Sequence, residues 1–223
     1  MEKLEYLNKY RKDVTIVTEI NEQVKAAIPG AWIDILGTED MQERIRKMLS
    51  IWRDALYTEL PNTFSYLEQN VKTLDFISYN DSIVVLYGIQ MGTGEIDYFE
   101  GGNPLDCESS DLFGGMPEKL KKFYLSAHNG FYYYPSGSGI VSIGRVTCFG
   151  ESEWGIIDDL EEPLQINLDT TYGFYNNGGG VYIAIDYQNC GDDNAVIWYA
   201  DDEPMYNVNF WTEIDDWLKT SFE

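Results

Sequence analysis

The stretch that decides the fold class is Ser82-Ile83-Val84-Val85-Leu86-Tyr87-Gly88-Ile89, where the hydrophobic pattern of the chain changes from helical to extended. It is rich in β-branched and apolar residues, and turn-forming residues bound it at Asn80-Asp81 and Gly92-Thr93-Gly94. These features are typical of a buried strand. Glu95 to Phe99 follows as its expected hairpin partner. We therefore expect mostly strands from about residue 75 onward.

The chain before this stretch, residues 1–74, is predicted to be mainly helical. Apolar residues recur at helical spacing from Ile45 to Leu60. Thr38 is the expected cap of this helix, with Glu39 and Asp40 in its first turn, and Pro61 is expected to end it. A further helix is predicted from Thr63 to Leu74.

The chain after residue 100 is predicted to form short strands and two helices. One helix is expected near residues 117–128, where Pro117 suits the first position and Asn129-Gly130 suits a stop. A closing helix is expected over residues 209–220. The expected strands are Phe131 to Tyr134, Ile140 to Val146, Gln165 to Leu168, Val181 to Asp186 and Ala195 to Tyr199. Helices followed by a strand meander predict a single α+β domain over residues 1–223, with a central, mostly antiparallel sheet flanked by helices.

The charge of the chain is strongly acidic and unevenly placed. The 223 residues contain 15 Lys and Arg against 38 Asp and Glu, a net charge of −23. Residues 1–150 carry a net charge of −7, whereas residues 151–223 carry −16 and only one cation, Lys219. Such a field attracts basic partners. It disfavours direct binding to nucleic acid or to anionic membranes, which requires basic patches.

The cysteine pattern and the lengths of the apolar segments indicate the compartment of the protein. Cys107, Cys148 and Cys190 are widely spaced and form no C-x-x-C pair, so we expect reduced thiols. The chain opens on charged residues instead of a leader, and no apolar run of about 18 residues occurs. We therefore expect a cytoplasmic protein with no membrane span.

Catalytic and metal-binding patterns are weak in this sequence. His128 is the single histidine, and packing at a helix end explains it better than nucleophilic catalysis. The acids and amides between Asp186 and Asn194 do not have the spacing of a calcium loop and suit a turn. Carboxylates are so abundant that pairs of them do not identify a glycosidase. We expect no catalytic residues, no metal and no cofactor.

Three runs in the last third of the chain combine acids with aromatic residues. They are Glu151-Ser152-Glu153-Trp154, Asp158-Asp159-Leu160-Glu161-Glu162 and Tyr199-Ala200-Asp201-Asp202-Glu203. Each run taken alone is adequately explained as a solvated loop. Taken together, acids around aromatic anchors suit the surface of a basic protein. The predicted partner-binding residues are Trp154, Asp158, Asp159, Glu161, Glu162, Trp198, Asp201, Asp202 and Glu203.

The segment from Met116-Pro117-Glu118 to His128-Asn129-Gly130 and the closing helix around Phe210-Trp211 and Trp217-Leu218 carry a family resemblance. On these features, residues 111–223 resemble the SUKH superfamily of immunity proteins. The segment from Met116 to Gly130 is similar to the family's "LP-x-x-y/l-x-x-F…NG" element, and the final strands and helix are similar to its closing elements. Two features depart from the family pattern: some 110 residues precede the element, and tryptophans replace phenylalanines in the closing helix. The resemblance implies an α+β domain. It also implies an immunity function, because many members of the family resemble proteins that neutralise toxins. It implies no shared catalytic or partner-binding residues.

The first functional hypothesis is therefore an immunity-type protein that binds a basic toxin domain, of the nuclease or deaminase class, by direct contact. The alternative is a small-molecule or glycan-binding protein, with or without hydrolase activity, that uses the aromatic segment Phe131 to Tyr134 and two carboxylates. A regulatory adaptor without a toxin partner has the same sequence features as the first hypothesis.

Overall fold

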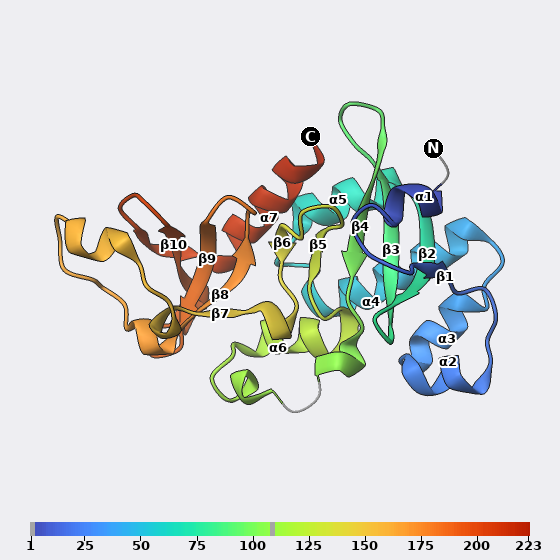
Figure 1. Ribbon diagram of the computed structural model, residues 1–223, viewed down its shortest axis with the longest axis horizontal. Helices are drawn as coiled ribbons and strands as arrows, with labels where there is room; N and C mark the ends of the chain where they lie inside the picture. The colour runs from blue at the N-terminus through green and yellow to red at the C-terminus, as the bar shows by residue number, and fades with distance from the viewer. Residues whose placement is uncertain (1–2, 108–109) are drawn as a thin grey trace.

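The computed structural model describes residues 3–107 and 110–223 (Figure 1). The α-helices are α1 (Lys3–Leu7), α2 (Glu22–Ala27), α3 (Gly30–Leu36), α4 (Met41–Leu56), α5 (Pro61–Asn70), α6 (Glu118–Lys122) and α7 (Phe210–Phe222). The strands are β1 (Thr15–Ile16), β2 (Val71–Tyr79), β3 (Ser82–Gln90), β4 (Ile96–Gly101), β5 (Phe131–Tyr133), β6 (Gly139–Ile140), β7 (Thr147–Cys148), β8 (Thr171–Asn176), β9 (Val181–Asp186), β10 (Asn194–Tyr199) and β11 (Met205–Asn209).

All strands within the described ranges join one eleven-stranded sheet along the length of the molecule. Its order is β1-β2-β3-β4-β5-β6-β8-β9-β10-β11, and β7 pairs with β8 beside that path. The pairings between neighbours are antiparallel. The predicted α+β class with an antiparallel sheet is thus confirmed.

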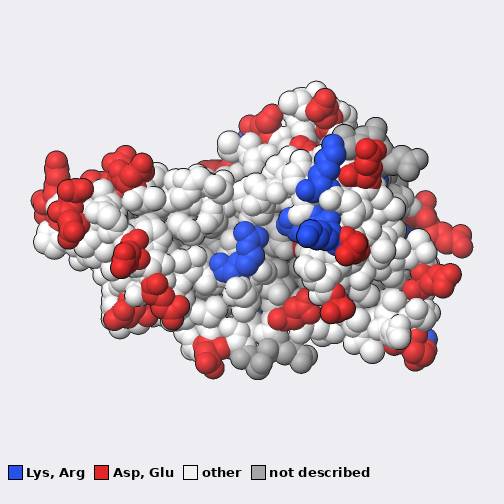
Figure 2. All heavy atoms as spheres, viewed as in Figure 1, with Lys and Arg blue, Asp and Glu red and all other residues white. Residues whose placement is uncertain are grey.

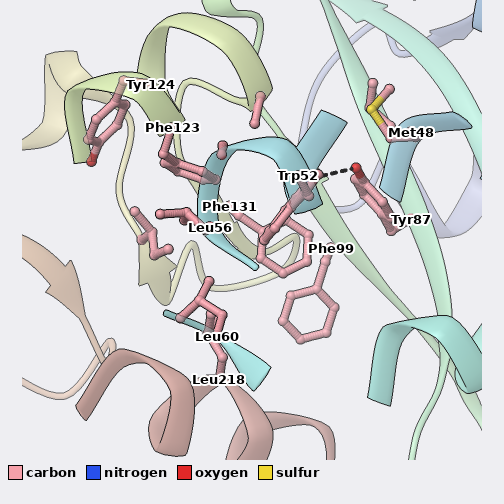
Figure 3. Packing of buried hydrophobic residues seen from close by; sticks show 14 of the residues in the cluster. Met48, Trp52, Leu56, Leu60, Tyr87, Phe99, Phe123, Tyr124, Phe131 and Leu218 are labelled. Atoms are coloured by element: carbon pink, nitrogen blue, oxygen red, sulfur yellow. Dashed lines mark hydrogen bonds between the residues drawn. The ribbon is translucent and has the colours of Figure 1, made fainter. Parts of the chain in front are cut away.

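The main hydrophobic core lies between one face of the sheet and helices α2 to α7 (Figures 1 and 3). Trp52 of α4 occupies its centre, where its ring packs edge-on to Phe131 at 4.8 Å and to Phe123 at 5.4 Å between ring centroids. Strand residues alternate between the two faces of a sheet. Val85 and Tyr87 of β3 therefore join this core, whereas Val84 and Leu86 point to the other face.

The opposite face of the sheet, here called the back face, carries a separate cover at each end. Helix α1 and the chain that follows it cover β2 and β3, with Leu7 and Val14 packed on Ile77 and Leu86. Residues 149–168 cover β8, β9 and β10, with half-buried apolar side chains packed on Trp198. This second segment, here called the strap, carries two of the three acidic runs singled out in the sequence, residues 151–154 and 158–162.

The N-terminal helices differ in detail from the prediction. The cap of α4 is Asp40, whose carboxylate accepts a hydrogen bond from the Glu43 amide, and not Thr38. Pro61 does not end a helix but begins α5, because proline fits the first helical turn, where the backbone N–H has no partner. The predicted helix to Leu74 ends at Asn70, and β2 begins at Val71.

The C-terminal half confirms several predicted elements and corrects others. The closing helix and the strands β9 and β10 lie where they were expected. The helix near residues 117–128 starts as α6 and continues as one π-helical turn, Phe123–Ala127. The predicted strand over residues 165–168 is wrong, because this segment belongs to the irregular strap. Strands β8 and β11 were not predicted.

No helix among residues 3–107 and 110–223 has the length and apolar character needed to cross a membrane.

Candidate functional site

Two of the predicted acidic runs meet in space although some forty residues separate them in the chain. The first lies on the strap, and the second forms the loop between β10 and β11. The backbone amide of Glu161 donates a hydrogen bond of 2.8 Å to Oε1 of Glu203, which joins the two loops. Their acids together form the acidic tip, which consists of Asp158, Asp159, Glu161, Glu162, Asp201, Asp202 and Glu203.

The charge of the acidic tip is uncompensated and open to solvent. All seven side chains are exposed. Within the described residues, no ion pair uses any of them. Figure 2 shows Asp and Glu, without Lys or Arg beside them, at the end of the molecule formed by these loops (left in the view), while the Lys and Arg visible on this face lie in its middle and toward the opposite end. The end of the molecule therefore presents a field of one sign.

Trp198 is not a partner anchor, which corrects the sequence prediction. It lies on β10 with its side chain on the back face, and its exposed fraction is 0% because the strap covers it. Its ring packs against Phe149 at 5.3 Å and Trp154 at 5.3 Å between centroids. Trp198 therefore supports the strap from beneath and contacts no solvent.

Trp154 is half-buried and has a double role. Its Nε1 donates to the carbonyl oxygen of Phe149 at 2.9 Å, and its ring packs on Trp198 and Tyr182. Only part of this ring is available to a partner. Met205, which directly follows the second acidic loop, is 51% exposed and accepts a hydrogen bond from the Tyr199 hydroxyl on its sulfur. Met205 is an exposed apolar side chain next to the second acidic loop that the sequence reasoning missed.

His128 belongs to the hydrophobic core. Its ring is fully buried beside Trp32 and Trp52. Trp52 Nε1 donates to the Tyr87 hydroxyl at 3.0 Å, so that hydroxyl donates its own proton to His128 Nε2 at 2.6 Å. His128 Nδ1 is left to donate to the carbonyl oxygen of Gly102 at 3.3 Å. The network therefore fixes the neutral tautomer of His128 with the proton on Nδ1, and the hydrogen bonds of the ring link β3 to the backbone at Gly102.

Burial of His128 makes stability dependent on pH. Burial lowers the pKa of His128 to about 3, whereas an unfolded histidine has a pKa of about 6.5. The unfolded chain therefore binds a proton that the folded chain does not, and stability falls as pH drops from about 6.5 toward 3, by up to about 1.4 kcal/mol per pH unit.

We expect the His128→Gln variant to lack this contribution. In urea unfolding at pH 7, 6, 5 and 4, the stability advantage of the unsubstituted protein over the variant should shrink steadily. Burial raises the pKa of Glu100, which gives a contribution of opposite sign, but it is common to both proteins and cancels in the difference. A difference that stays constant over this pH range would contradict the prediction.

Within the part of the chain that the structure describes, no three His, Cys, Asp or Glu side chains are grouped so that they could hold a metal ion.

The aromatic segment of the alternative hypothesis is divided between the core and a pocket. Phe131 packs on Trp52 in the core, and Tyr134 is buried under Arg11. Tyr132, in contrast, lines a pocket on the back face together with the buried carboxylate of Glu100. Sequence reasoning missed Glu100, whose only signal is an acid placed after Tyr98-Phe99 inside an apolar strand.

Comparisons of the chain with protein-family models, with curated proteins and with solved structures find no match. The resemblance to the SUKH superfamily therefore stays a prediction, and the function is inferred from the geometry of the chain itself.

Proposed function

We propose that this chain is a cytoplasmic immunity-type protein of SUKH-like fold, which binds a basic toxin domain through the acidic tip and blocks its active site or substrate groove. The observation that carries the proposal is the joining of two acidic loops at one end of the sheet through the Glu161–Glu203 hydrogen bond. Seven exposed carboxylates without ion-pair partners favour an encounter with a cationic surface.

The surroundings of the tip support a protein partner. Protein interfaces combine a polar rim with apolar contacts near the centre. Met205 and the exposed part of Trp154 supply apolar surface next to the carboxylates. Toxins that act on nucleic acid need a basic groove for their substrate, so an acidic surface is complementary to the part of the toxin that must be blocked.

The chemistry of the thiols supports the proposed compartment. Cys107, Cys148 and Cys190 are free and form no disulfide with one another. Free thiols are typical of proteins in a reducing cytosol.

The test is to capture the partner from the source cells and to measure its binding kinetics with three forms of the chain. One variant carries Asn or Gln at all seven acids of the tip. A control variant carries the same number of neutral replacements at exposed acids elsewhere that form no ion pairs, namely Glu5, Glu19, Glu39, Asp54, Glu95, Asp111 and Glu118.

We expect neutralisation of the tip to lower the association rate constant by about tenfold or more, since charge complementarity mainly accelerates encounter. The rate for the unsubstituted protein should fall steeply between about 50 mM and about 500 mM salt, whereas the rate for the tip variant should change little. The control variant should behave nearly like the unsubstituted protein. Equal losses in both variants would show that only the total charge matters and would refute the proposed surface.

A captured toxin also permits a functional measurement. Addition of the unsubstituted chain should abolish the toxin's activity at equimolar concentration, and the tip variant should require a large excess. A captured partner whose activity is unaffected by the chain would contradict the immunity role and favour a regulatory adaptor.

A further inference from the structure

An open groove lies where the last turns of α7 meet the ends of β6 and β8 (Figure 1). Its volume is about 400 Å³, which is within the range of small-molecule sites. Two of its walls come from strand ends and the third from the helix. The lining residues are Ser138, Tyr175, Asn177, Trp217, Thr220 and Ser221.

The lining of this groove is uncharged, although the chain is rich in charge. The sequence contains 15 Lys and Arg and 38 Asp and Glu, yet none of the described residues that line the groove is charged. The lining consists of an indole, a phenol, a carboxamide and three aliphatic hydroxyls. Recognition of an ionic ligand normally uses an opposite charge, so this lining favours a neutral ligand.

The apolar part of the lining is the indole of Trp217. This side chain is half-buried, packs against the main core and lines the groove with its open part. The ring of Tyr175 lies 5.5 Å from it between centroids, at an interplanar angle of 87°. Trp217 is therefore held in place from the core side and offers a fixed apolar surface to a ligand.

The hydroxyl of Tyr175 is a polar group without a partner in the protein. The side chain is only 3% exposed, and none of the hydrogen bonds among the described residues uses its hydroxyl. This hydroxyl is not one of the unpartnered polar atoms that are fully buried, so the small accessible part of Tyr175 includes it. Burial raises the pKa of Tyr175, so the hydroxyl keeps its proton and can donate to a ligand.

Two polar side chains of the lining are oriented by hydrogen bonds to the backbone. Oδ1 of Asn177 accepts from the amides of Gly179 at 2.7 Å and Val181 at 3.0 Å, which leaves the Nδ2 hydrogens as free donors. The hydroxyl of Ser221 donates to the carbonyl oxygen of Leu218 at 2.6 Å, so its lone pairs are left to accept. The groove thus presents donors and acceptors in fixed directions.

We propose that this groove binds a neutral sugar, either free or as one residue of a glycan. A sugar hydroxyl donates and accepts at once, which matches a lining of free donors, free acceptors and hydroxyls. The C–H groups on one side of a sugar ring form an apolar surface that suits the electron-rich face of an indole. The volume equals that of about thirteen waters, which is enough for one hexose ring with its hydroxyls.

The groove is separate from the other sites considered. It shares no residue with the acidic tip, and it uses neither the aromatic segment Phe131 to Tyr134 nor a pair of carboxylates. The sugar proposal therefore does not depend on the proposed function. The variant with all seven tip acids neutralised should bind sugars as the unsubstituted chain does, so failure of one proposal leaves the other intact.

The test is a titration of the full chain with neutral methyl glycosides, followed by two-dimensional ¹H–¹⁵N NMR. The probes are the methyl glycosides of glucose, galactose, mannose and N-acetylglucosamine, and the signal is the indole N–H resonance of Trp217. We expect at least one glycoside to shift this resonance with a dissociation constant of about 1 to 10 mM, because an open groove leaves much of a ligand in water.

Two matched compounds test the chemistry of recognition. Sorbitol has the hydroxyls of a hexose but no ring with an apolar face, and it should bind at least tenfold more weakly than the best glycoside. The corresponding methyl glucuronide adds a carboxylate and should also bind more weakly. A disaccharide of the best sugar distinguishes the sources: binding at least threefold tighter assigns the groove to a glycan, and equal or weaker binding assigns it to a free sugar.

Three variants connect the binding to the groove. Trp217→Leu keeps an apolar cover on the core and removes the ring, so affinity should fall at least tenfold; loss of its signal also identifies the Trp217 resonance. Asn177→Asp keeps the acceptor for the two amides and removes the free donor, so affinity should fall at least threefold, even if Trp217→Leu fails to fold. Tyr57→Leu removes an exposed ring outside the groove and should leave affinity unchanged.

Four results would overturn the proposal. The first is that no glycoside shifts the Trp217 resonance at concentrations up to about 100 mM. The second is sorbitol binding as tightly as the best glycoside, and the third is the glucuronide binding more tightly, which would assign the groove to anions. The fourth is unchanged affinity in folded Trp217→Leu and Asn177→Asp variants.

Discussion

Replacement of Trp52 by alanine is expected to lower the free energy of unfolding by about 4 kcal/mol. The indole is fully buried and lies among Phe64, Tyr87, Phe123 and Phe131 of four different elements (Figure 3). Removal of the indole leaves a cavity that the four surrounding elements cannot fill by moving inward. It also removes the Nε1–H group that donates a hydrogen bond to the Tyr87 hydroxyl. Urea unfolding followed by far-ultraviolet circular dichroism measures the loss.

The matched control is Tyr57→Ala, which removes an aromatic side chain just beyond the end of the same helix. Tyr57 is 53% exposed and contacts Phe64 and Arg53 at the surface. We expect it to cost less than about 1 kcal/mol. Similar losses from the two substitutions would contradict the central position assigned to Trp52.

The second large effect is expected from Asp215→Ala, because Asp215 caps a helix to which it does not belong. Helix α5 begins after Leu60 without a side-chain cap of its own. Asp215 of α7 supplies the acceptors instead: Oδ1 accepts from the Thr63 amide at 2.7 Å, and Oδ2 accepts from the Asn62 amide at 3.0 Å. A carboxylate at a helix N-terminus is also favoured by the helix dipole.

Loss of this carboxylate leaves the backbone amides of Asn62 and Thr63 without partners in the contact between α5 and α7. This contact is buried, since Asp215 itself is only 3% exposed. We expect a loss of about 3 kcal/mol in the free energy of unfolding. Asp215→Asn, which keeps one acceptor oxygen, should recover roughly half of that loss. The neighbouring and exposed Asp216 is the control, and Asp216→Ala should change stability by less than about 0.5 kcal/mol. Equal effects at positions 215 and 216 would show that helix charge, and not the cap, is responsible.

The sequence predicted the secondary structure correctly where one hydrophobic pattern was strong and no second pattern fitted the same residues. The helical spacing from Ile45 to Leu56 and the β-branched run of β3 each agree with the structure. It failed at β2 because Leu67, Val71 and Leu74 also have helical spacing. The helix ends at Asn70 because the next residues pair with β3, and that long-range pairing is not encoded in the local pattern.

The missed strands of the C-terminal half have weak local signals for identifiable reasons. Strand β8 contains Gly173, where an added Cβ would lie 2.9 Å from the Tyr182 ring. Glycine has a low strand propensity, but here it allows the Tyr182 ring to pack closely against the backbone of β8. Strand β11 alternates exposed and half-buried residues and contains two asparagines. Tertiary contacts, and not intrinsic preference, hold both in the sheet.

The candidate site was predicted in part. The exposure of the acids was predictable from their charge. Their concentration in the last third of the chain indicated that they could share one surface, which the structure shows as the acidic tip. Trp198 was assigned wrongly because strand alternation cannot reveal that the strap covers the second face of β10. Glu100 was missed because one acid among 38 carries little information, and only the tertiary structure brings the hydroxyls of Tyr79 and Tyr132 to its carboxylate.

The two ends of the sheet bear on the solubility of the protein at high concentration. Exposed edge strands are templates for pairing with other chains, and long regular edges promote aggregation. Here β1, at one end, is only two residues long, and β11, at the other end, pairs irregularly with β10 and contains Asn207 in the left-handed region with φ of 56°. Neither edge offers a long, flat row of amide and carbonyl groups to a second copy. Short and irregular edges therefore disfavour edge-to-edge pairing of two copies, and the high negative charge adds mutual repulsion between them.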